Sequence, residues 1–312
     1  MTEIPALTRR RTVALGSAIA ATSLIRPALA DSDDESSGLP VKQIEQILGA
    51  NGTVSSGVLS ININRNDLKA SLPGGIHVAP AELLNGTIYM QSLGKGRAIM
   101  NGDFGLKPSE TGPFINALVQ NGITVQAFHQ HLYDLSPMVW FVHFRGIGDP
   151  IAIAKGTRNA IKVTSTPLPQ HTPKHPPTPF DHKKLAHILG GKAQVGDSGV
   201  VVVDVDRAEQ IHLGGVAIKP GLGVATNVAF QPLDKNGTKA LAIPDFAMIA
   251  SEVNAVFKTM FGEQFVNGCL YNQETDEQPQ LYFSHQWAVG DPYDLARRIR
   301  KGLDHTNSKF KS

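Results

Sequence analysis

Apolar and polar residues follow the same order in two successive stretches of the chain, residues 40–165 and 180–306. Each stretch begins with a short amphipathic segment, continues with alternating, strand-like segments and a helical segment, and ends with two more strands and a helix. This order favours helices gathered on one face of an antiparallel sheet. The pattern therefore predicts an α+β fold, a tandem repeat of two similar α/β-sandwich halves, each an antiparallel sheet with helices on one face.

The ends of several elements can be placed from capping and turn residues. Helices are predicted over Val41–Leu48, over Asp181–Leu189, from Ser109 to Gln120, and after Asp149-Pro150. Strands are predicted over Val54–Asn64, Thr87–Gln91, Arg97–Met100, Thr124–Tyr133, Met138–Arg145 and Val200–Val205. Asn85-Gly86 and Asn236-Gly237 are typical of hairpin turns, and Asp103 and Asp245 are assigned to turns as well.

Internal identities support the duplication. A shift of 142 residues places Asp103-Phe104 on Asp245-Phe246, and Phe141 and His143 on Phe283 and His285. The alignment needs no gap from residue 103 to residue 158. Such self-similarity at a long period indicates repeated structural units. Residues 166–179, rich in Pro, are predicted to form an extended linker between the units.

The first thirty residues have the pattern of a secretory signal peptide. Arg9, Arg10 and Arg11 precede a short apolar stretch, and small residues end the segment at Ala30. The adjacent arginines resemble a twin-arginine signal. We expect cleavage after Ala30, flexible tails at 31–39 and 307–312, and a periplasmic or secreted protein without stable membrane insertion.

Composition excludes several other classes of protein. One Cys in 312 residues rules out an internal disulfide scaffold, and 41% hydrophobic residues argue against a disordered chain. The formal net charge of +2 includes four Arg and one Glu in the first thirty residues, so the remainder is close to neutral. Nothing in this balance favours a nucleic-acid partner.

Three histidines form the best candidate site. His129 and His131 alternate on a predicted strand and therefore point to the same face. A three-residue loop at Leu135-Ser136-Pro137 would place His129 opposite His143 and His131 opposite Phe141. Three imidazoles on one face suit a divalent transition metal, zinc first, with copper, iron or nickel as alternatives.

The repeat offers a competing interpretation of these histidines. His143 recurs as His285, but His129 and His131 correspond to Tyr271 and Gln273. A histidine that recurs in a repeat without the other two histidines can have a structural role, such as a hydrogen bond to the backbone, and not a role as a metal ligand. Both interpretations, metal ligands and structural or ligand-bonding histidines, stay open at this point.

Two further positions recur in both halves. Glu110 and Glu252 begin a helix, where a negative charge is favourable, but Glu110 could also act as a catalytic base beside the histidines. Arg65 and Arg207 recur near a strand end, and Arg65 could bind an anionic group of a ligand.

The layout resembles the bacterial family labelled domain of unknown function 1259, which includes the LppY and LpqO lipoproteins. The resemblance rests on Arg65–Leu68, Gly102-Asp103-Phe104, Glu110, Phe128–His131, Phe141–Phe144 and Gly146–Asp149. It implies that the three histidines belong to a family pattern, but it implies no activity. A lipid anchor is not expected here, because no Cys lies near Ala30.

Two functions remain as hypotheses. The first is metal-assisted hydrolysis of an unknown small molecule at His129, His131 and His143, with the ion activating water. The second is a non-catalytic module of the cell envelope that binds a cell-wall component or a partner protein.

Overall fold

The computed structural model describes residues 37–170 and 177–311. The predicted signal peptide lies outside the described residues, so the structure does not bear on it. No helix within the described part of the chain is long and apolar enough to cross a membrane.

The first repeat forms a six-stranded antiparallel sheet with the strand order β1-β2-β5-β6-β8-β7. Its strands are β1 (Gly52–Ser55), β2 (Val58–Asn64), β5 (Asn85–Gly94), β6 (Arg97–Leu106), β7 (Thr124–His129) and β8 (Trp140–Gly148). Its helices are α1 (Val41–Leu48), α2 (Pro108–Gln120) and α3 (Pro150–Ile161).

The second repeat forms a sheet of the same size, with the order β15-β16-β14-β13-β10-β9. Its strands are β9 (Lys192–Val195), β10 (Val201–Val205), β13 (Thr226–Pro232), β14 (Ala240–Met248), β15 (Val266–Asn267) and β16 (Tyr282–Gly290). Its helices are α4 (His182–Leu189), α5 (Ala250–Gly262) and α6 (Pro292–Leu303). The predicted α+β fold of two similar halves is confirmed.

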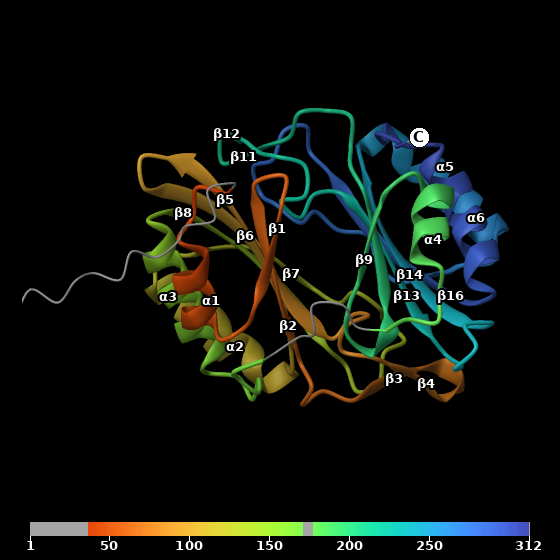
Figure 1. The fold of residues 1–312 in the computed structure, drawn as a ribbon, viewed down its shortest axis with the longest axis horizontal. Helices are drawn as coiled ribbons and strands as arrows, with labels where there is room; N and C mark the ends of the chain where they lie inside the picture. The colour runs from red at the N-terminus through yellow and green to blue at the C-terminus, as the bar shows by residue number, and fades with distance from the viewer. Residues whose placement is uncertain (1–36, 171–176, 312) are drawn as a thin grey trace, which may run out of the picture. The chain divides into compact units, whose positions relative to one another are not determined.

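The two sheets face each other, and the helices cover their outer faces (Figure 1). Alternation along the strands explains this layering. In β2, Leu59, Ile61 and Ile63 pack in the core beneath the helices, whereas Ser60 and Asn62 point toward the other sheet. Each sheet therefore buries an apolar face under its own helices and turns a more polar face toward the other repeat.

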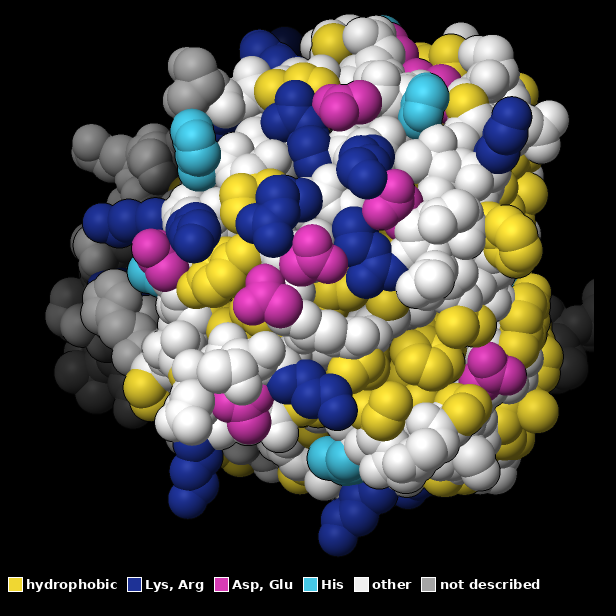
Figure 2. Space-filling view, turned by 90° about the vertical axis from the view of Figure 1, so that its right-hand side faces the viewer, with side chains coloured by type: hydrophobic (Ala, Val, Ile, Leu, Met, Phe, Trp, Pro, Cys, Tyr) yellow, Lys and Arg dark blue, Asp and Glu magenta, His cyan; other side chains and the backbone are white. Residues whose placement is uncertain are grey.

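The helices on the outer face of the second repeat are amphipathic, with charged side chains toward solvent and apolar side chains toward the sheet. Lys and Arg side chains lie next to Asp and Glu side chains over this face (Figure 2). Arg300 and Lys301 of α6 form ion pairs with Asp304 and Glu263. Leu295 and Ile299 of the same helix are buried against the sheet. Charges of both signs are mixed there, which gives no large positive field on this face.

Two small arms cross between the repeats. In the first repeat β3 (Ala70–Leu72) and β4 (Ile76–Val78) pack with Leu241 and Ile243 of the second. In the second repeat β11 (His212–Leu213) and β12 (Val216–Ala217) pack with Val58 and Ile99 of the first.

A buried glutamine fixes each arm in the same way. The Gln231 side chain accepts a hydrogen bond from Ala79 N (2.7 Å) and donates one to His77 O (2.8 Å). The Gln91 side chain accepts from Lys219 N (2.7 Å) and donates to Ala217 O (3.5 Å). We call these two arrangements the glutamine clamps. They tie the repeats together reciprocally, as expected for a duplicated unit with two-fold pseudosymmetry.

Three local predictions differ from the structure. The strand predicted over Val54–Asn64 is a hairpin, because Ser56 and Gly57 both adopt positive φ and turn the chain. Asn85-Gly86 lies inside the sheet and not in a turn. A Cβ at Gly86 would lie 2.1 Å from the ring of Phe104, so glycine is required there by close packing.

Asp103 and Asp245 are not turn residues either. They lie within β6 and β14, on the faces that point toward the other repeat. The turn at Asn236-Gly237 and the helix that begins after the Asp149 cap are as predicted.

Candidate metal centre

A polar cleft of about 880 Å³ lies between the two sheets. Its lining comes from both repeats, with Asn62, Asn101 and Asp103 from the first, and Asp204 and Asp245 from the second. These side chains occupy the strand positions that alternate with the apolar core. The cleft is therefore a direct consequence of packing two polar sheet faces against each other.

Three histidines gather beside this cleft. His129 is the last residue of β7 and His143 lies in β8, and their Nε2 atoms are 3.0 Å apart. The ligand nitrogens of His129, His131 and His143 all lie within 4.8 Å of one another. Zinc–nitrogen bonds of about 2 Å require ligand nitrogens within about 4 Å of each other, so a small inward movement would complete the set.

The strand register differs from the prediction, but the histidines still share one face. His129 is paired with Phe141 and Ala127 with His143, a shift of two residues from the expected pairing. The cause is a longer connection between the strands; the bulge between Val125 and Ala127 lies beyond these pairs and leaves them unchanged. A shift of two preserves the side-chain face, whereas a shift of one would reverse it.

His131 lies beyond the end of β7 and reaches the cluster by stacking. Its ring centroid is 3.5 Å from that of Phe141 and 3.8 Å from that of His285. The side chain is buried, and neither ring nitrogen has a hydrogen-bond partner among the described residues. A buried imidazole without partners is costly, and an ion bound to one of its two nitrogens would reduce that cost.

The second repeat completes the surroundings of the cluster. Tyr271 stacks on His129 with ring centroids 3.6 Å apart, and His285 stacks on His131. Gln273, which corresponds to His131, donates a hydrogen bond to Gly223 O in the second repeat. The second repeat has therefore lost two of the histidines, but it builds one wall of the site.

Burial keeps these imidazoles neutral. It lowers the pKa of His129 to about 4, although a hydrogen bond with Gln130 O acts in the opposite direction. Burial also lowers the pKa of His131 and His143 well below the usual value, and neighbouring histidines add to the effect. Neutral imidazole is the form that binds a metal.

An aspartate lies next to a histidine in each repeat. Asp103 pairs with His143 across β6 and β8, and Asp245 pairs with His285 across β14 and β16. Burial raises the pKa of Asp103 to about 7 and the pKa of Asp245 well above its usual value. The sequence pattern assigned both residues to turns and did not predict their place beside the histidines, although their identity under the repeat alignment was a usable signal.

Arg65 and Glu110 are paired with each other. The Arg65 guanidinium donates to Glu110 Oε2 (2.9 Å), to Asp67 and to Gly105 O, and it is fully buried. Although burial acts to raise it, the pKa of Glu110 is lowered by hydrogen bonds from Ser165 and Lys107 and by the Arg65 charge. Neither residue lines the cleft.

The second repeat has the same ion pair. Arg207 donates to Glu252, Glu209 and Ala247 O, as Arg65 does to Glu110, Asp67 and Gly105 O. Repetition of the whole arrangement in a half that lacks the His129 and His131 equivalents is what a structural role predicts.

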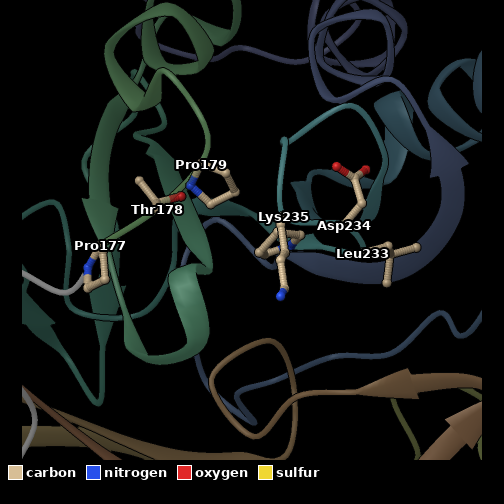
Figure 3. Close-up of a pocket in the computed structure, with 7 residues that line it drawn as sticks. Pro177, Thr178, Pro179, Leu233, Asp234 and Lys235 are labelled. Carbon is tan, nitrogen blue, oxygen red and sulfur yellow. The ribbon is translucent and has the colours of Figure 1, made fainter.

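A second hollow, of about 600 Å³, lies where the end of the linker meets the turn between β13 and β14 (Figure 3). Its lining includes Pro177, Pro179 and Leu233, with Asp234 and Lys235 as its charged residues. The Asp234 carboxylate accepts hydrogen bonds from Asn236 N and Thr238 within its own turn. This hollow therefore offers fewer groups for ligand binding or catalysis than the cleft.

Comparison with known proteins gives one match. A family model described as Domain of Unknown Function (DUF1259) matches residues 42–163 and again residues 183–305. No curated protein and no solved structure matches the chain significantly.

Proposed function

Because the chain belongs to the DUF1259 family, whose description names no activity, we propose a function from the geometry of the cleft: a metal-binding protein that hydrolyses a small molecule or cell-wall component. His129, His131 and His143 would hold one divalent transition metal, zinc first. The observation that carries the proposal is His131, which is buried beside two other histidines with both ring nitrogens unpartnered among the described residues.

A bound zinc ion would supply a water molecule of lowered pKa and a Lewis acid for the substrate. Residues of the chain would orient the metal ligands and admit the substrate. Tyr271 and His285 hold the imidazole rings by stacking, and His131 and His143 line the cleft, which gives a substrate access to the site. Asp245 Oδ1, buried without a hydrogen-bond partner in the described part of the chain, is available to hold a proton.

Arg65 and Glu110 have no part in this proposal, because their charges are already paired away from the cleft. A nucleic acid is not proposed as a partner, since the chain after residue 30 is close to neutral.

Metal content tests the proposal directly. Protein from residue 31 onward, made without a His tag, should contain about one equivalent of metal by elemental mass spectrometry. His131→Ala should lose it, whereas His187→Ala, at an exposed position on α4, should retain it. Equal metal content in the two variants would exclude the assigned ligands.

A non-catalytic binding module is the second candidate. The cleft extends well beyond the histidines and is lined by both repeats, which favours a ligand larger than the metal site alone requires. No metal after loading with zinc, copper or iron would support this alternative over hydrolysis.

We further propose export to the periplasm or the exterior by a twin-arginine signal. The support is the pattern of residues 1–30. Replacing Arg9 and Arg10 by Lys should leave the precursor in the cytoplasm, as judged by fractionation. Normal export of that variant would contradict the proposal.

A further inference from the structure

Buried hydrogen-bond acceptors without partners line the cleft. Asn64, Glu82 and Asn101 are 4%, 5% and 1% exposed, and all three belong to its lining. Asn64 Oδ1, Asn101 Oδ1 and both carboxylate oxygens of Glu82 have no hydrogen-bond partner among the described residues. Native proteins leave few buried polar atoms in this state, so several in one cleft need an explanation.

The orientation of the two amides is fixed by their other atom. Asn64 Nδ2 donates to Asp197 Oδ2 (2.7 Å), and Asn101 Nδ2 donates to Leu222 O (2.9 Å). Both partners are acceptors, so the nitrogen must occupy that position and the oxygen must be the free atom. The groups that would satisfy these oxygens must therefore be hydrogen-bond donors.

The lining of the cleft does not favour an anionic polymer. Asp103, Asp204 and Asp245 belong to this lining, and no Arg does among the described residues. Its cationic side chains are those of Lys192, Lys309 and Lys311. A ligand that is rich in donors and not strongly anionic fits this distribution.

The volume of the cleft and an aromatic residue in its lining narrow the class of ligand further. The cleft volume of about 880 Å³ lies near the upper end of ordinary small-molecule sites, which span about 300–1,000 Å³. Tyr89 also belongs to its lining and adds an aromatic side chain among the polar groups. Many hydroxyl donors combined with apolar ring faces are the properties of a saccharide.

We infer that the cleft binds a neutral oligosaccharide, whose hydroxyl groups donate to Asn64, Glu82 and Asn101. This inference rests on the proposed function in one respect: it names the class of molecule that the histidine site would act on. Binding itself requires only the cleft and no metal.

Calorimetric titration of the full chain tests the inference. The probes are cellotetraose, maltotetraose and chitotetraose, with spermidine as a cationic donor, each added to protein treated with a chelator and to protein loaded with zinc. At least one tetrasaccharide should bind in both states. Glu82→Gln, which replaces one acceptor oxygen by an amide nitrogen that only donates, should weaken that binding about tenfold.

Glu277→Gln is the matched control. Glu277 is also buried with an unpartnered carboxylate oxygen in the described structure, but it does not line the cleft. This variant should bind the tetrasaccharide as the unsubstituted protein does. If Glu82→Gln does not fold, Asn64→Ala, which removes another of the unpartnered acceptors in the lining, should weaken the binding instead.

Three outcomes would overturn the inference: no binding of any tetrasaccharide, binding of spermidine alone, or equal weakening in the variant and its control. Failure of the metal proposal would be visible separately. Saccharide binding without metal uptake would contradict only the metal site, and metal uptake without saccharide binding would contradict only this inference.

Discussion

His129 depends on a tyrosine from the other repeat for its position. Tyr271 stacks on its ring at 3.6 Å between centroids, and His143 contacts its Nε2 atom. Groups that orient a ligand influence metal affinity although they do not touch the ion. The second repeat therefore contributes to the site through packing.

Substitution of this tyrosine gives a prediction at the residue scale. Tyr271→Ala should weaken metal binding about 10- to 100-fold, because His129 loses the surface that orients it. Tyr271→Phe retains the ring and should bind metal nearly as well as the unsubstituted protein. Competition with a chromophoric chelator measures both affinities. Equal loss in the two variants would show that the hydroxyl matters and not the stacking.

The free energy of unfolding should depend on pH through a second residue, Glu277. Burial, together with the charge of Glu274, raises the pKa of Glu277 to about 8 from 4.5, although a hydrogen bond from Leu281 N opposes the shift. Between these values the folded protein holds a proton that the unfolded chain releases. The contribution of Glu277 to the free energy of unfolding therefore falls as pH rises from 4.5 to about 8.

Glu277→Gln should remove this dependence. Relative to the unsubstituted protein, the variant should gain about 1–3 kcal/mol in free energy of unfolding between pH 5 and pH 8.5. Urea unfolding at the two pH values measures the difference. A constant difference between the two proteins would show that Glu277 titrates normally in the fold.

At the scale of elements, the glutamine clamps join each arm to the other repeat. Gln231→Ala leaves the buried Ala79 N and the partly buried His77 O without their side-chain partner. It should lower the free energy of unfolding by about 1–3 kcal/mol, as measured by urea unfolding. Gln120→Ala, at an exposed position on α2, should change it little. Similar losses in both variants would argue against a specific role for the clamp.

The strand register illustrates what pattern can and cannot predict at this scale. Alternation in β7 and β8 correctly places His129 and His143 on one face. It does not predict the loop length, so the pairing is wrong by two residues. The bulge and the ten-residue connection after His129 have no simple signal in the hydrophobic pattern.

At the scale of the whole molecule, the repeats should unfold together. Both arms and both clamps cross between them, and three of the apolar clusters contain residues of both halves. The repeats are linked by more than the chain segment between them. Cooperative unfolding follows from such shared packing.

The two tryptophans lie in different repeats, Trp140 in β8 and Trp287 in β16, where Trp287 packs against an apolar cluster shared by both repeats. The single-tryptophan variants Trp287→Phe and Trp140→Phe should show fluorescence transitions in urea that coincide with the circular dichroism transition of the same variant. A fluorescence change well before loss of secondary structure would mean that the repeats unfold independently.

The sequence alone determined the duplication, the kinds of element in each half and the common face of His129 and His143. The duplication is visible as residue identities at a fixed shift, and the other two properties depend on the periodicity, caps and turns formed by neighbouring residues. The sequence could not reveal that Arg65 and Glu110, 45 residues apart, neutralise each other. Only the tertiary structure brought Tyr271, His285 and Asp245 to the histidines, because packing of the two polar sheet faces decides which distant side chains meet.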